Sequence, residues 1–140
     1  MDEQSSVLPE SEPPLVLRTA PPQRHQLARS MTAQGAAAAG GIWWELVDAA
    51  AAPELPAVGV ALTHNREPGY VTVSALGVRH GDAWEEYAEL LRGLVAALRS
   101  RAADTVIVHA ANQVVARALL EVGFMHTADR NDGDHYLIVL

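Results

Sequence analysis

The residues with the clearest chemical potential lie where a predicted strand, 70–78, meets a predicted amphipathic helix that runs to about Leu98. The first N–H groups of a helix are unpaired and its dipole favours an anion, so many α/β proteins hold a phosphate at such a junction. Arg79 and Gly81 suit a phosphate. The other charged side chains there are acidic: Asp82, Glu85 and Glu86. The junction therefore has the position of a phosphate-binding loop and a different chemistry.

These acids have a structural interpretation beside the functional one. Asp82 can serve as the N-cap of the helix, with Glu85 three residues later completing a capping-box-like pair. Acidic side chains in a first helical turn contribute a few tenths to about 1 kcal/mol of stability. We therefore expect the helix to be capped by its own side chains, which would weaken the binding of a phosphate ligand.

Two residues could accept a proton in catalysis. His109 ends the predicted strand 104–109, and an unperturbed histidine titrates near neutral pH, which suits a general base. Glu45, on the predicted strand 42–47, is a second candidate. Each also has an ordinary interpretation, one as a partly exposed histidine at a strand end and the other as a glutamate on an exposed strand face.

Trp43 and Trp44 are adjacent on that same strand. Neighbouring strand residues point to opposite faces, so one indole should pack in the core while the other faces solvent, a substrate groove or a partner. The pair is thus a candidate contact for a homodimer or a protein partner.

Composition limits the possible chemistry. The absence of cysteine excludes disulfides and a cysteine nucleophile, and all 10 basic residues are arginine, which excludes a lysine Schiff base. A net charge of −7 argues against binding to nucleic acid or to an anionic membrane. Several histidines show no metal-ligand spacing, and no metal is expected: His64, His80, His126 and His135.

Length and hydropathy indicate the organisation of the chain. A length of 140 residues suits one domain, and 49% apolar but only 5% aromatic residues predict a core of Ala, Val and Leu. Residues 1–13 are expected to be a disordered acidic tail, and 14–140 a single domain. Apolar runs fall short of the roughly 20 residues of a membrane span, and the acidic N-terminus does not resemble a signal peptide. We expect a cytoplasmic location.

Periodicity predicts the secondary structure. Alternating or β-branched runs indicate strands, and apolar residues at steps of three and four indicate helices. The three strands before the long helix should form an antiparallel meander. The predicted strands are 14–18, 42–47, 57–62, 70–78, 104–109, 124–128 and 135–140, and the predicted helices are 23–33, 82–98 and 112–122.

This order of elements resembles the GCN5-related N-acetyltransferase (GNAT) family, as does Asn112 followed eleven and twelve residues later by Gly123 and Phe124. The resemblance covers nearly all of the chain after the tail. It implies an α/β (α+β) fold with a GNAT-like mixed central sheet, order β-α-β-β-β-α-β-α-β-β, and helices on both faces. It also implies transfer of an acyl group from acetyl-CoA or another acyl-CoA to an amine.

The resemblance also implies binding roles. In the family, the pantetheine arm of acyl-CoA lies between a strand that ends in Leu-x-Val and a later strand that splays away from it. Leu76 and Val78 would bind the arm through backbone groups, and Asn112 would assist. Arg79 would meet phosphate, with Gly81 as the glycine of the loop. The proton of the amine would pass to one of the two candidate bases.

The chain departs from the family pattern in two places. Where the family has Arg or Gln, two residues, Gly, one residue, then Gly or Ala, this junction has one glycine, Gly81. Many members also place a tyrosine, which protonates the leaving thiolate, seven residues after the asparagine, and that position is Leu119 here. The remaining candidates for the acid are Tyr87, Tyr136, His109 or a water.

Two functions are therefore under consideration. One is an acyl-CoA-dependent N-acyltransferase. The other is a GNAT-like fold without competent CoA binding that acts as a protein-interaction or regulatory module. The first is the leading expectation, and the acidic junction, the missing tyrosine and a tryptophan expected to be exposed motivate the second.

Overall fold

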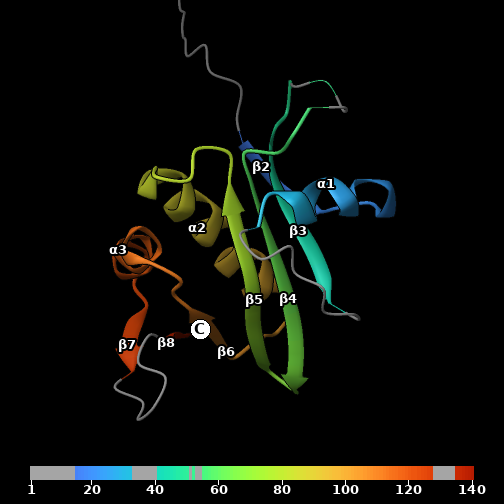
Figure 1. Ribbon diagram of the computed structural model, residues 1–140. Coiled ribbons are helices and arrows are strands. Elements are labelled where there is room, and N and C mark those ends of the chain that lie inside the picture. Colours follow the sequence, from blue (N-terminus) through green and yellow to red (C-terminus); the bar gives the residue numbers. More distant parts are fainter. Residues whose placement is uncertain (1–14, 33–40, 51, 53–54, 128–134) are drawn as a thin grey trace, which may run out of the picture.

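The computed structural model describes residues 15–32, 41–50, 52, 55–127 and 135–140, so the predicted tail lies outside the described residues. The predicted order of elements is confirmed (Figure 1). The strands are β2 (Leu15–Thr19), β3 (Ile42–Asp48), β4 (Gly59–Glu67), β5 (Tyr70–Val78), β6 (Thr105–His109), β7 (Met125–Thr127) and β8 (His135–Val139). The helices are a 3-10 turn η1 (Pro22–Arg24), α1 (His25–Ser30), α2 (Trp84–Ser100) and α3 (Gln113–Val122).

The described strands form one seven-stranded sheet in the order β2-β3-β4-β5-β6-β8-β7. Strands β2 to β5 are antiparallel neighbours, as the meander prediction requires, and β5 pairs with β6 in parallel. Strand β4 runs past its predicted end at Leu62 because Pro68 and Gly69 close a tight hairpin with β5. Gly69 has a φ of +84°, which favours glycine.

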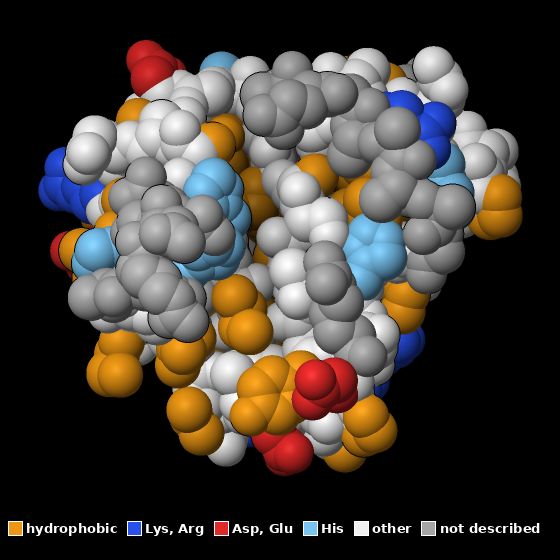
Figure 2. Space-filling model, turned by 60° about the horizontal axis from the view of Figure 1, so that its bottom comes forward, with side chains coloured by type: hydrophobic (Ala, Val, Ile, Leu, Met, Phe, Trp, Pro, Cys, Tyr) orange, Lys and Arg blue, Asp and Glu red, His pale blue; other side chains and the backbone are white. Residues whose placement is uncertain are grey.

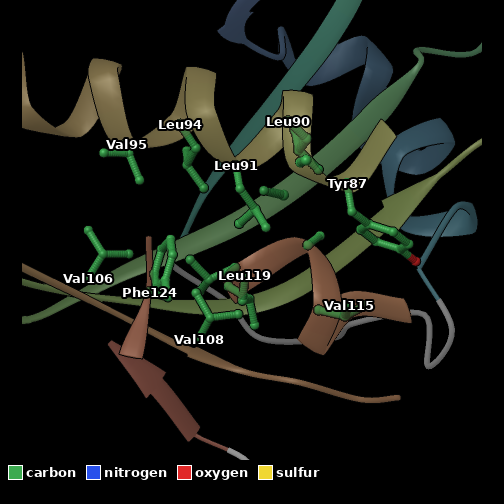
Figure 3. Close-up of a cluster of buried hydrophobic side chains, with 14 of the residues drawn as sticks. Tyr87, Leu90, Leu91, Leu94, Val95, Val106, Val108, Val115, Leu119 and Phe124 are labelled. Atoms are coloured by element: carbon green, nitrogen blue, oxygen red, sulfur yellow. The ribbon is translucent and has the colours of Figure 1, made fainter. Parts of the chain in front are cut away.

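Helices cover both faces of the sheet, as predicted (Figure 1). Helices α2 and α3 pack in one core cluster with Trp44 and Ala61, and α1 contributes Ala28 to a second cluster with Trp43 and Val60. Since adjacent strand residues point to opposite sides, these clusters lie on opposite faces. Figure 3 shows the larger cluster, to which α2 gives a stripe of buried side chains: Leu90, Leu91, Leu94 and Val95.

The predicted capping box of α2 is wrong. The helix begins at Trp84, its N-cap is Ala83, and no side chain caps it. Because the helix starts later than predicted, Asp82 lies outside it and Glu85 occupies its second position. The third position, from which a capping-box carboxylate reaches back, belongs to Glu86.

The prediction that one of the two tryptophans faces solvent is also wrong. Trp43 is 4% exposed and Trp44 is 3% exposed, because each face of the strand lies beneath a helical layer. The Trp44 indole N–H donates to Thr63 Oγ1 at 2.9 Å, and the Arg101 guanidinium lies 4.9 Å from the ring centroid. Neither indole forms an exposed contact for a partner.

Glu45 lies in a buried ion cluster that ties the η1 turn to the sheet. Its side chain is 1% exposed, and its two oxygens lie 2.8 Å from Arg24 Nε and 2.9 Å from an Arg18 terminal nitrogen. The Arg24 guanidinium also donates to the Leu55 carbonyl at 3.0 Å. Two arginines thus neutralise one buried carboxylate, which a strand-face pattern alone does not indicate.

We expect Glu45→Ala to lower the free energy of unfolding by about 3–5 kcal/mol, because it leaves the buried Arg24 guanidinium without this carboxylate. Arg18→Ala is the matched control, since it removes the half-exposed partner of the same group and should cost about 1 kcal/mol or less. Urea denaturation followed by tryptophan fluorescence measures both. Equal losses in the two variants would contradict this account of the cluster.

Candidate functional site

The site begins where β5 and β6 separate. The two strands pair only from Tyr70 with Thr105 to Val73 with Val108, whereas β5 continues to Val78. On its other side, the β4–β5 register shifts so that Leu62 opposes Ala75 and Thr63 opposes Val73. Ser74 is therefore the extra residue of a β-bulge, which bends its strand. Among the described strands, the stretch 74–78 has β4 as its single neighbour.

A cleft of about 480 Å³ opens along this unpaired stretch, within the usual size of ligand sites, about 300–1,000 Å³. Its walls come from β5, from the starts of α2 and α3, from the end of β6 and from the residues after α1. Histidine side chains are prominent on the face drawn in Figure 2, where acidic and basic side chains are sparse. The lining residues with polar side chains are Thr32, Ser74, Tyr87, His109 and Asn112.

Four of the five predicted cofactor-binding residues line this one cleft: Leu76, Val78, Gly81 and Asn112. The fifth, Arg79, lines a different cavity of about 380 Å³, together with Arg18 and Arg24. The structure therefore brings the residues assigned to the pantetheine arm together with the loop glycine, Gly81, whereas Arg79, assigned to phosphate, lines another cavity.

Asn112 does two things at the edge of the cleft. It is the N-cap of α3, and its Oδ1 accepts the Val115 N–H at 3.0 Å. Its amide nitrogen has no partner among the described residues. The side chain can therefore offer the N–H donors of its amide to a molecule in the cleft.

Tyr87 of α2 and His109 at the end of β6, two of the predicted catalytic residues, both line the cleft. In Figure 3 the Tyr87 hydroxyl points away from the leucine cluster. Burial raises the pKa of the Tyr87 phenol, so the group stays protonated and can act as an acid. The exposed His109 ring lies 4.9 Å from the His135 ring, centroid to centroid.

Glu45 and Tyr136 do not line the cleft. Glu45 is held in the buried ion cluster, so the structure gives it a stabilising role in place of the predicted catalytic one. Tyr136 is 7% exposed and packs against His126, with the two ring centroids 4.8 Å apart. Leu119, at the position of the family's tyrosine, is fully buried in the core.

The sequence interpretation missed a pair at the bulge. Ser74 Oγ lies 2.7 Å from His64 Nδ1, and His64 Nε2 is buried with no hydrogen-bond partner among the described residues. Ser74 lines the cleft. No local signal links the two residues, because the register shift that brings Ser74 to His64 is a property of the β4–β5 hairpin.

Glu86 holds the junction between β5 and α2. Its Oε2 lies 3.2 Å from Arg79 Nε and 3.0 Å from His80 Nδ1, and its Oε1 accepts the His80 backbone N–H at 3.3 Å. Partial burial acts to raise the pKa of the Glu86 carboxyl, but the bonds from His80 and Arg79 outweigh it and hold that pKa below its usual value. The carboxylate therefore stays charged at neutral pH and accepts hydrogen bonds from the loop residues Arg79 and His80.

Within the described part of the chain, no three potential metal ligands come together. None of the described helices is long and apolar enough to cross a membrane.

Known structures share this architecture. An IAA acetyltransferase from Bacillus cereus superposes with a TM-score of 0.64 at 14% identity, over 91% of this chain and 100% of that one. A Bacillus subtilis acetyltransferase in complex with CoA gives 0.64 at 11% identity, over 91% and 99%. The ribosomal-protein-S18-alanine N-acetyltransferase from Escherichia coli gives 0.61 at 12% identity, over 90% and 92%.

No family model and no curated protein matches the sequence. The likeness is therefore one of fold. The sheet order, the parting of β5 from β6 and the superpositions together define a GNAT fold. The three solved structures compared above are described as acetyltransferases.

We expect Asn112→Ala to lower the free energy of unfolding by about 1 kcal/mol, because the first turn of α3 loses its cap. Asn112→Asp keeps a capping oxygen, removes the amide donor, and should leave stability within about 0.5 kcal/mol of the parent. Thermal or urea unfolding of both variants tests the assignment. Equal destabilisation by the two substitutions would show that the cap is not the stabilising contact.

Proposed function

We propose that this protein is an N-acyltransferase that moves an acyl group from a pantetheine thioester, such as acetyl-CoA or another acyl-CoA, to an amine. The observation that carries the proposal is the unpaired edge of β5 over 74–78, which opens on a cleft of ligand size. Backbone N–H and C=O groups at a free strand edge need partners. The amide groups of a pantetheine arm have the chemistry to supply them.

The arm has specific partners in this proposal. Leu76 and Val78 are two residues apart, so their backbone groups point to the same edge of β5. The amide nitrogen of Asn112 adds a donor from the start of α3. Apolar side chains on the other walls, such as Val73 and Val115, suit the methylene groups of the arm.

The reaction would be direct. The amine nitrogen attacks the thioester carbonyl carbon, a C–N bond forms, and the C–S bond breaks. His109 takes the proton that the amine loses, and the Tyr87 phenol gives a proton to the departing thiolate. The Ser74 hydroxyl, held by His64, lies on the same cleft and can orient the carbonyl or the amine.

A second candidate is a GNAT fold that acts as an interaction or regulatory module without CoA binding. The observation that favours it is at the junction, where Glu86 occupies the groups that would meet phosphate. The burial of both tryptophans removes the contact first expected for a partner. The two candidates differ in one measurable property, which is the binding of a pantetheine thioester.

Binding and turnover test the proposed function. We expect acetyl-CoA or S-acetylpantetheine to raise the melting temperature, and we expect thiol release from them to depend on an added amine. Because the chain has no cysteine, a colorimetric thiol assay has no background from the protein. If neither thioester binds at millimolar concentration, the enzyme proposal fails and the second candidate stands.

We expect His109→Ala and Tyr87→Phe each to lower kcat by about 10²-fold or more while leaving the fold intact. His126→Ala is the control, since His126 lies on the neighbouring hairpin and does not line the cleft. A variant of either cleft residue with parental kcat would remove that residue from the mechanism.

A further inference from the structure

The basic side chains of the loop before α2, which could bind an anion, are already bound to one. The Arg79 guanidinium, the His80 imidazole and the His80 backbone N–H all contact the two oxygens of Glu86, at 3.0–3.3 Å. Glu86 belongs to the first turn of α2, so its carboxylate is fixed beside the loop by the helix itself. The protein thus supplies its own anion at the place where a ligand phosphate would lie.

The charge around the junction also opposes a further anion. Asp82 and Glu85 are exposed on either side of the helix start in the sequence, so the stretch 79–86 carries three carboxylates and one guanidinium. A diphosphate there would have to displace Glu86 and would then lie near carboxylates of the same sign, at a cost in free energy. The electrostatics therefore do not fit a diphosphate.

The next arginine near the helix start is engaged as well. Arg117, in the middle of α3, lies over the Trp84 ring at 4.2 Å from its centroid, in a cation–π contact that joins α3 to the start of α2. The one glycine of the loop, Gly81, has open space where a side chain would stand, so no close backbone approach explains it. Neither feature provides a cradle for phosphate.

The cleft beside this junction has the opposite character. The free edge of β5 and the Asn112 amide offer uncharged hydrogen-bonding groups, and they do not depend on the junction. The polar groups suited to a pantetheine arm are therefore present, while the basic side chains that would neutralise a diphosphate are bound to Glu86. The pantetheine half of acyl-CoA would therefore meet uncharged hydrogen-bonding groups, whereas the diphosphate half would meet acidic side chains.

We propose that this protein recognises its acyl donor by the pantetheine arm alone, so that its donor class is acyl-pantetheine thioesters whether or not a nucleotide diphosphate is attached. The inference rests on the proposed function, and it names the donor class of the same cleft. Two sources share this chemistry: free acyl-CoA and a phosphopantetheinyl group on a carrier protein.

Calorimetric titration of the full chain with acetyl-CoA and with S-acetylpantetheine tests the proposal. We expect the two dissociation constants to agree within about threefold, because the diphosphate adds no favourable contact. A preference of about tenfold or more for acetyl-CoA would overturn the inference while leaving the proposed function intact. Absence of binding by both thioesters would instead refute the proposed function, and the inference with it.

A variant that removes the negative charge of Glu86 provides a second test. Glu86→Gln should tighten acetyl-CoA binding by about tenfold and leave S-acetylpantetheine binding unchanged, because Arg79 loses its competing carboxylate. Glu86→Ala serves the same purpose if the first variant folds poorly. Glu89→Gln is the matched control: it removes the same charge from the same helix, one turn from the junction, where Glu89 contacts only Arg92 among the described residues. Equal tightening by Glu89→Gln would mean that net charge, and not the occupied loop, sets the affinity.

An acetylated phosphopantetheinyl carrier domain distinguishes the two sources. A tighter interaction with this domain than with S-acetylpantetheine would assign the natural donor to a carrier protein. An interaction no tighter than that of the small thioester would assign it to a free thioester. Either result supports recognition by the arm.

Discussion

The end of backbone pairing between β5 and β6 is the constraint on which the rest of the site depends. If the two strands stayed paired to Val78, the sheet would be continuous there and no cleft would open. The bulge at Ser74 is where β5 changes its course, and the same bulge places the Ser74 hydroxyl against His64. The strand edge left beyond it carries polar groups that a ligand with amides can satisfy. A local irregularity in one hairpin thus provides both the cavity and part of its chemistry.

The second constraint is electrostatic and acts at the end of the same strand. Glu86 reaches back from α2 to the loop that leaves β5, and it ties strand, loop and helix together with hydrogen bonds to Arg79 and His80. The contact that orders this junction also occupies its two basic side chains, Arg79 and His80. Fold and ligand chemistry are therefore separate questions here: the architecture is that of a GNAT fold, while the basic side chains of the junction are bound to a carboxylate of the protein itself.

Coverage of both sheet faces explains the other differences from expectation. Glu45 and Trp44 lie on β3, where an alternating pattern predicts that one face of the strand is exposed to solvent. Because α2 covers one face and the η1–α1 segment covers the other, both side chains are buried, and each finds its partner on another element. Glu45 pairs with Arg18 and Arg24, and Trp44 bonds Thr63. Buried polar groups of this kind require partners, and those partners are distant in sequence.

The sequence by itself determined the order of strands and helices, the meander, the stripe of α2 and the resemblance to the GNAT fold, because these depend on periodicity and turn residues within short windows. Six of the residues that it singled out, Leu76, Val78, Gly81, Asn112, Tyr87 and His109, line one cleft, because strand ends and helix starts meet at one edge of such a sheet. Only the tertiary structure decided that Glu45 pairs with two arginines, that Ser74 meets His64, and that Glu86 rather than Asp82 and Glu85 organises the start of α2. Those outcomes depend on the register of paired strands and on one or two residues at a helix boundary. Strand register and helix boundary are both set by packing across the whole sheet, and a local sequence pattern does not predict that packing.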